Sequence, residues 1–133
     1  MSGSFFDTNV LLGLAFREER DVSKMLNLVS GGGTVSVQVL NEIVNVSRKK
    51  HRKPWPEIID FLSLVREFLD VVPVTVEVHE RGLMLAEKHG FSTYDAMIVA
   101  AALLNGCETL WSEDMHHGMA VEGKLRIVNP FRE

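Results

Sequence analysis

The chain has 133 residues, of which 46% are hydrophobic and 24% are charged, a balance typical of one folded globular domain covering residues 1–133. The longest apolar run, residues 96–104, is far shorter than the roughly 20 residues that cross a bilayer. The single cysteine excludes an internal disulfide, and the first eight residues do not have the pattern of a secretion signal. We therefore expect a cytoplasmic protein with no membrane segment.

Strands and helices alternate along the chain. Apolar residues recur at helical spacing between short β-branched runs, glycines 31–33 and Gly90 end two helices, and Pro73 places its strand at a sheet edge. Thr8 and Asn9 offer capping oxygens before the first helix. In chain order we expect strand 4–7, helix 10–16, helix 21–29, strand 34–37, helix 38–50, helix 57–68, strand 71–74, helix 77–89, helix 92–104, and strands 109–111 and 125–128. This order predicts a mainly parallel five-stranded sheet that is covered on both faces.

Three acidic residues follow strands or begin helices. Asp7 comes after Phe5-Phe6, Asp114 comes after strand 109–111, and Asp95 stands three residues after Ser92. Each has a structural explanation as a helix cap or turn residue. In a parallel α/β sheet, however, binding sites form beyond the carboxyl ends of the strands, near the switch point of the topology. These three positions are therefore also candidates for a site.

Glu42 is a fourth candidate. It lies three residues after Val39 and four before Val46, which places its carboxylate on an apolar face of helix 38–50. A carboxylate there must find a partner or become protonated. A salt bridge at the edge of the apolar stripe would be the structural explanation, and membership of an acidic site would be the functional one.

Four carboxylates at one end of a sheet repel one another. Two unit charges about 4 Å apart cost about 4 kcal/mol at an effective dielectric constant near 20, so such a cluster needs protons or a cation. Oxygen ligands favour Mg²⁺, Mn²⁺ or Ca²⁺ over zinc. Carboxylates and a metal, without a positioned nucleophilic side chain, favour hydrolysis of phosphodiester bonds.

The same residues resemble the PIN-domain nucleases, and in particular the VapC-type ribonuclease toxins of toxin–antitoxin pairs. The resemblance covers nearly the whole chain, through five stretches in order: residues 5–12, 37–42, 94–102, 110–115 and 129–131. It implies a three-layer α/β/α sandwich and an Mg²⁺- or Mn²⁺-dependent endoribonuclease. It implies the catalytic and metal-binding acids Asp7, Glu42, Asp95 and Asp114, and the ligand-orienting residues Thr8, Asn9 and Ser112.

Some members of that family carry a further acid two residues beyond the Asp114 position. This chain has His116 there, so we expect four acids and not five, and we expect Glu113 to point away from them. Whether one metal ion or two would bind is open. The resemblance also implies an RNA substrate, a small antitoxin as partner, and a homodimer.

Two other functions compete with the toxin. One is a nuclease of the same fold that acts in RNA processing without an antitoxin. The other is a receiver-like signalling domain that binds Mg²⁺. That fold needs a paired acid on its first strand and a lysine after its fifth strand. Here Asp7 has no adjacent acid, and the late Lys124 precedes the last strand.

The formal net charge of −4 weakens a nucleic-acid function without excluding it, because net charge does not report how charges are distributed. The most basic run contains Arg48, Lys49, Lys50, Arg52 and Lys53. Cations at a helix end complement the helix dipole, which explains the run structurally. Contact with RNA phosphates is the functional alternative, and both can hold.

Overall fold

A computed structural model describes residues 3–17 and 19–132. Its strands form one sheet in the order β3-β2-β1-β4-β6-β5, and all neighbouring pairs except β5 and β6 are parallel. The strands are β1 (Ser4–Phe6), β2 (Thr34–Ser36), β3 (Asp70–Val72), β4 (Thr109–Trp111), β5 (Ala120–Val121) and β6 (Leu125–Val128). The helices are α1 (Thr8–Phe16), α2 (Glu19–Ser30), α3 (Val37–Lys49), α4 (Trp55–Phe68), α5 (Val76–His89) and α6 (Thr93–Leu104).

The mainly parallel sheet is confirmed, but the expected number of five strands is wrong. The additional strand, β5, has two residues and pairs antiparallel with β6, Val121 opposite Leu125. Glu122 and Gly123 have positive φ values of 53° and 67° and turn the chain between them. Two residues are too few to produce an alternating pattern in the sequence. Strand β3 lies at the sheet edge, as Pro73 indicates.

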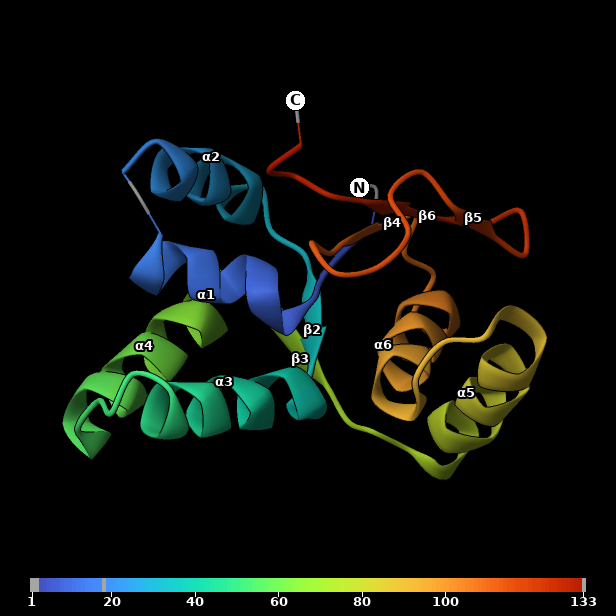
Figure 1. Ribbon diagram of the computed structural model, residues 1–133, viewed down its shortest axis with the longest axis horizontal. Helices are drawn as coiled ribbons and strands as arrows, with labels where there is room; N and C mark the ends of the chain where they lie inside the picture. The colour runs from blue at the N-terminus through green and yellow to red at the C-terminus, as the bar shows by residue number, and fades with distance from the viewer. Residues whose placement is uncertain (1–2, 18, 133) are drawn as a thin grey trace.

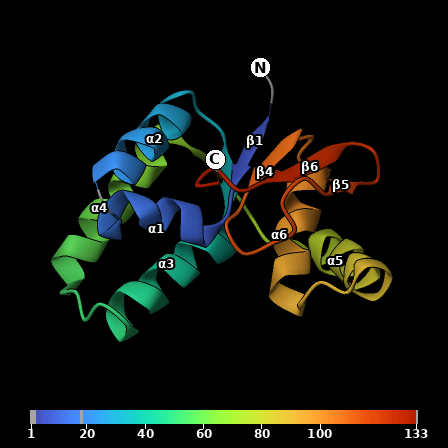
Figure 2. The same ribbon diagram turned by 45° about the horizontal axis from the view of Figure 1, so that its top comes forward.

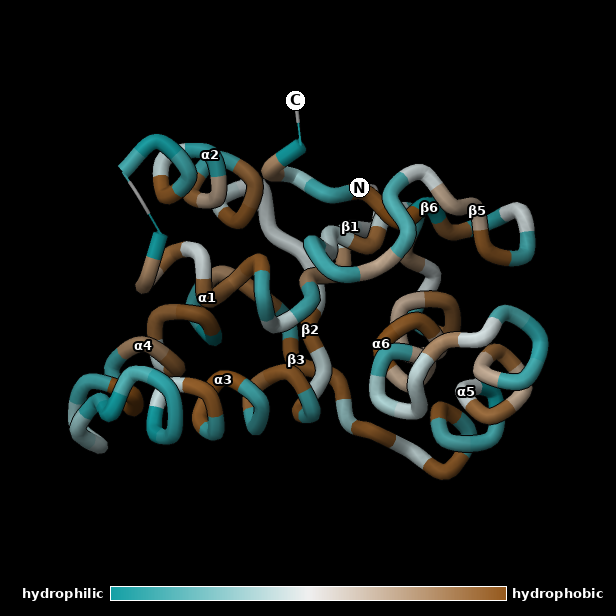
Figure 3. Tube along the Cα trace, in the orientation of Figure 1, coloured by the Kyte–Doolittle hydropathy of each residue, from teal (hydrophilic) through white to brown (hydrophobic). Residues whose placement is uncertain are grey.

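Helices cover both faces of the sheet. Helices α1 to α4 gather on one side and α5 and α6 on the other, which gives the three layers of an α/β/α sandwich (Figures 1 and 2). Helix α6 is apolar on nearly all sides (Figure 3), because it packs between the sheet and α5. Gly82 lets α5 come close to α6, since a Cβ atom there would lie 2.6 Å from the Met97 sulfur.

The first helix begins two residues earlier than the sequence indicates. Asp7 is its N-cap, and an Asp7 carboxylate oxygen accepts a hydrogen bond from the Thr8 backbone N–H. Thr8 and Asn9 are therefore helical residues and not the cap, which frees their side chains for other contacts.

The topology switches direction at β1. The chain leaves β1 to form β2 and β3 on one side, and later places β4 on the other side of β1. At the carboxyl ends, the Asp7 N–H donates to the Trp111 carbonyl (2.9 Å), and the Ser112 N–H donates to the Val128 carbonyl (2.9 Å). The first bond holds Asp7 beside the end of β4, and the second holds Ser112 beside the end of β6, so both residues lie just beyond the strand ends where open α/β sheets form their sites.

Within residues 3–17 and 19–132, no helix is long and apolar enough to span a membrane.

Candidate active site

The four acidic residues identified from the sequence line one cavity of about 250 Å³. They come from different elements: Asp7 from the cap of α1, Glu42 from α3, Asp95 from the first turn of α6, and Asp114 from the loop after β4. Thr8 and Asn9 also line it, and Leu12, Asn45 and Val46 complete the wall. The fold therefore brings together carboxylates that lie up to 107 positions apart in the chain.

Asp7 is the most buried of these acids, with 4% of its surface exposed. One carboxylate oxygen accepts the Thr8 N–H at 2.7 Å. The other accepts the Ser112 hydroxyl at 2.7 Å and the Asn9 amide at 3.3 Å. The side chain is thus fixed by three donors from the cap of α1 and the end of β4.

Burial raises the pKa of Asp7 from its ordinary value of 3.8 to about 6. The hydrogen bonds from Ser112 and Thr8 lower the pKa, and the negative charges of Asp95 and Glu42 raise it, but desolvation is the largest effect. Ionised Asp7 therefore lowers the stability of the folded protein, and a cation in the cavity would restore part of that stability.

Glu42 accepts two hydrogen bonds from neutral side chains. Its Oε1 accepts the Thr8 hydroxyl at 2.5 Å, and its Oε2 accepts the Gln38 amide at 3.0 Å. Among the described residues no lysine or arginine forms an ion pair with it, so the salt bridge considered as its structural explanation is absent there. Its charge remains available to the cavity.

Asp95 and Asp114 complete the acidic set. The Ser92 hydroxyl caps α6 by accepting the Asp95 N–H at 3.2 Å. The pKa of Asp95 is raised, mainly by burial and further by the charges of Asp114 and Glu42, against the lowering effect of its hydrogen bond with Ser92. Asp114 is exposed, and its Oδ2 accepts the Asn9 amide at 3.0 Å. Asn9 thus bridges Asp7 and Asp114.

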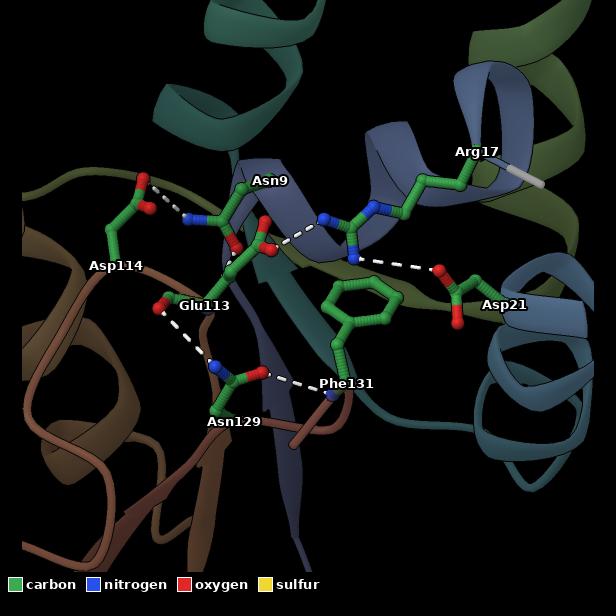
Figure 4. Close-up of polar contacts among 7 residues, drawn as sticks. All are labelled: Asn9, Arg17, Asp21, Glu113, Asp114, Asn129 and Phe131. Carbon is green, nitrogen blue, oxygen red and sulfur yellow. Dashed lines mark hydrogen bonds and ion pairs between the residues drawn. The ribbon is translucent and has the colours of Figure 1, made fainter. Parts of the chain in front are cut away.

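A network of hydrogen bonds and ion pairs holds the loop that carries Asp114 (Figure 4). The Asn9 side-chain oxygen accepts the Glu113 N–H at 3.0 Å. The Glu113 carboxylate turns away from the cavity to form an ion pair with Arg17, as expected. The Arg17 guanidinium lies 3.7 Å from the centre of the Phe131 ring and 3.8 Å from the Asp21 carboxylate.

Asn129 attaches the end of the chain to the same loop. Its amide nitrogen donates to the Glu113 carbonyl at 3.5 Å, and its side-chain oxygen accepts the Phe131 N–H at 2.9 Å. Residues 129–131 were noticed in the sequence only through the family resemblance. No pattern in the sequence indicated a role for Arg17, because its partner Glu113 lies 96 residues away.

The donor chemistry of the cavity fits a hard divalent cation. Its polar groups are carboxylate, hydroxyl and carboxamide groups, whose oxygens are the ligands that Mg²⁺ and Mn²⁺ prefer. In residues 3–17 and 19–132, however, no three Asp, Glu, His or Cys side chains are arranged so that they could hold a metal ion. Asp7, Glu42 and Asp114 instead turn toward neighbouring hydrogen-bond donors. Binding an ion would require these carboxylates to reorient.

The basic run lies at the end of α3 and does not line the cavity. The Arg48 guanidinium stacks 4.6 Å from the Trp55 ring and donates to the Lys53 carbonyl at 3.1 Å. Lys53 forms an ion pair of 3.7 Å with Glu57. Structural roles therefore account for these two, whereas the exposed Lys49, Lys50 and Arg52 stay candidates for contact with RNA.

The sequence matches the PIN domain family over residues 4–118. The chain belongs to the PIN-domain family. PIN domains are nucleases that generally use divalent metal ions, so membership supports a hydrolase that acts on nucleic acid.

Several solved structures share this fold. A toxin–antitoxin complex from Klebsiella pneumoniae matches with a TM-score of 0.72 and 19% identity over 98% of this chain and 100% of that one. VapC20 of Mycobacterium tuberculosis, described as a sarcin-ricin loop cleaving toxin, has a TM-score of 0.65 and 18% identity over 84% and 90%. A DNA-bound VapBC from Salmonella typhimurium has a TM-score of 0.64 and 21% identity over 96% and 97%. No curated protein matches the sequence.

The burial of Asp7 predicts a pH-dependent cost in stability. Because its pKa of about 6 in the folded state is above the ordinary 3.8, folding favours the protonated form. The stability gained from protonated Asp7 is fully present below pH 3.8 and is lost as the pH rises through 6. Without metal, Asp7→Asn should gain stability over the wild type between pH 4 and pH 8, by at most about 3 kcal/mol.

Urea unfolding of both proteins in EDTA across that pH range measures the difference. Glu67→Gln is the matched control, because Glu67 is an exposed acid on α4 outside the cavity, and it should not reproduce the gain of Asp7→Asn. A difference between Asp7→Asn and the wild type that does not change with pH would contradict the account of Asp7.

Proposed function

We propose that this protein is a metal-dependent endoribonuclease that acts as the toxin of a type II toxin–antitoxin pair, within a single PIN domain formed by residues 1–133. The observation that supports it most strongly is the convergence of Asp7, Glu42, Asp95 and Asp114 on one cavity at the switch point of the sheet. Membership of the PIN family supports nucleic acid as the substrate, and the fold shared with toxin–antitoxin proteins supports the toxin role.

In this proposal the four carboxylates hold Mg²⁺ or Mn²⁺. When bound, the ion supplies positive charge that activates water and stabilises the transition state of phosphodiester hydrolysis. Ser112, Thr8 and Asn9 limit how far Asp7, Glu42 and Asp114 would have to turn when the ion binds, because each holds one carboxylate oxygen by a hydrogen bond. Ser112 also favours the ionised form of Asp7, and that form is the one that binds a cation.

The first test is cleavage of RNA by the purified protein. With Mn²⁺ or Mg²⁺, the wild type should cleave single-stranded RNA internally and leave DNA of the same sequence intact, and EDTA should stop the reaction. Asp7→Asn and Glu42→Gln should each lower kcat/KM by at least about 100-fold, because each removes a charge that the metal ion needs.

Glu67→Gln is the matched control for that test, since Glu67 is an exposed acid on α4, outside the cavity. It should cleave at the wild-type rate. Full activity in EDTA, or in Asp7→Asn with its fold intact, would refute the metal-dependent mechanism. Equal cleavage of RNA and DNA would refute the RNA specificity alone.

The partner that we propose is a small antitoxin, and one groove of the protein suits it. A hollow of about 280 Å³ lies between α1, α2 and α4, and the side chains of Leu26, Leu64 and Phe68 on its wall are 43–49% exposed. Exposed apolar side chains around a groove are typical of surfaces that bind an amphipathic segment of another protein. The proposed homodimer would need a different surface. Helix α5 offers one, because Val76 and Met84 are exposed on it.

Growth assays test the antitoxin. Expression of the wild type should arrest growth, and co-expression of the small protein encoded beside it should relieve the arrest. Phe68→Asp should still arrest growth but lose most of the relief, because it places a charge in the groove. Ile59→Asp is the control, since Ile59 is 57% exposed on the same helix but outside the groove.

An RNA-processing nuclease without an antitoxin is the second candidate function, and persistent arrest with every neighbouring reading frame would favour it. Membership of the PIN family excludes the receiver-like signalling domain, the other alternative considered from the sequence.

A further inference from the structure

A second and larger hollow, of about 780 Å³, adjoins the acidic cavity. Glu42 and Asn45 line both, so the two hollows lie next to each other along α3. The wall of the larger hollow is formed by Val37, Gln38, Asn41, Glu42, Asn45, Pro73, Val74 and Tyr94. A strand of nucleic acid whose phosphate lies at the acids could therefore place a neighbouring nucleotide there.

The wall chemistry does not suit a phosphate. No lysine or arginine is among its lining residues, and its only charged side chain is the anionic Glu42. Phosphate binding depends on cations or clustered N–H groups. The wall offers instead apolar surface from Val37, Pro73 and Val74, together with carboxamides that can donate and accept hydrogen bonds. A flat, neutral group with polar edges fits this surface, and a nucleobase has that chemistry.

Tyr94 is the aromatic residue of this wall. It is the chain's single tyrosine, its surface is 69% exposed, and it directly precedes Asp95. Gln38 ties the Tyr94 backbone to one of the acids: the Gln38 amide donates to the Tyr94 carbonyl at 3.1 Å and to Glu42 at 3.0 Å. An exposed aromatic ring next to the acidic cavity is a platform on which an unpaired base can stack.

Two carboxamides face the same hollow from α3. Asn41 and Asn45 both have exposed side chains, four residues apart and therefore on one face of the helix. Neither side chain takes part in a hydrogen bond among the contacts of the described residues, in contrast to the side chain of Gln38. Their donors and acceptors are available to the edge of a base.

We propose that this hollow is a nucleobase subsite, in which an unpaired base next to the scissile phosphate stacks on Tyr94 and forms hydrogen bonds with Asn41 and Asn45. This inference rests on the proposed function, because it takes the acidic cavity as the place where a nucleic-acid strand is cut. It makes the substrate a single-stranded or locally unpaired segment, since a paired base could not enter. It also assigns base preference to Asn41 and Asn45.

A binding experiment tests the subsite without requiring cleavage. Asp7→Asn protein is titrated with a fluorescent oligoadenylate and with an abasic ribose-phosphate oligomer of the same length, and fluorescence anisotropy gives each Kd. The oligoadenylate should bind about 10-fold more tightly, because stacking contributes about that factor for each base. Adding Tyr94→Ala should remove most of this difference, whereas Tyr94→Phe should keep it.

Ile59→Ala is the control, because Ile59 is a large apolar residue, 57% exposed, that lies outside both hollows and outside the antitoxin groove. In the active enzyme, Tyr94→Ala should raise KM for RNA by about 10-fold with a smaller change in kcat, and Asn45→Ala should change the base found beside the mapped cleavage ends. The midpoint of thermal unfolding should stay the same, since the Tyr94 side chain is exposed.

The possible failures are distinguishable. Equal binding of the two oligomers, or a preference for bases that survives Tyr94→Ala, overturns the subsite even if the wild type cleaves RNA. A Tyr94-dependent preference for bases in a protein that does not cleave RNA supports the subsite while the proposed function fails. If sedimentation shows that Tyr94→Ala instead splits a dimer, the hollow is a contact between two copies, and the subsite is overturned.

Discussion

The burial of the Asp7 carboxylate is the constraint on which the rest of the site depends. The side chain lies at the switch point of a mainly parallel sheet, between the end of β1 and Ser112, which follows β4, and it is 4% exposed. Desolvation raises its pKa to about 6. A folded protein that keeps an acid at such a position gives up stability at neutral pH. A cation bound beside it would restore that stability, which links the fold to the chemistry proposed for the cavity.

Two of the remaining acids, Glu42 and Asp114, are held by the helix turn that follows Asp7. Asn9 connects Asp7 to Asp114 through one amide group, and Thr8 connects the same helix turn to Glu42. Helix α1 thus organises three of the four carboxylates through two consecutive residues that follow its cap. Behind the loop, the Arg17 ion pair and the stacked Phe131 ring turn Glu113 away and keep Asp114 at the cavity.

Much of this arrangement could be predicted from the sequence, because it depends on local patterns. Apolar periodicity located the helices, and the alternation of strands and helices predicted a parallel sheet. Glu42 drew attention because a carboxylate on an apolar helix face needs an explanation. The structure gives that explanation as neutral donors from Thr8 and Gln38, where the sequence also allowed a salt bridge. The family resemblance was needed to connect acids that a helix cap alone could explain.

What the sequence did not predict depends on contacts between distant residues. The hydrogen bond from Gln38 to Tyr94 spans 56 positions, and the ion pair between Arg17 and Glu113 spans 96. Neither residue pair forms a local pattern, so neither could be found without the fold. Strand β5 was missed for a different reason, because its two residues become a strand only by pairing with β6. The roles of the acids as metal ligands stay a prediction.

Calorimetric titration with Mn²⁺ tests the link between buried acid and cation most directly. Titrations at pH 6 and pH 8, each in two buffers of different ionisation enthalpy, give the affinity and the number of protons released. With the pKa of Asp7 at about 6, the wild type should release about half a proton per ion from Asp7 at pH 6 and almost none at pH 8. Asp7→Asn should bind Mn²⁺ at least about 10-fold more weakly. Equal Mn²⁺ binding by the wild type and Asp7→Asn, or proton release that does not change with pH, would contradict the account.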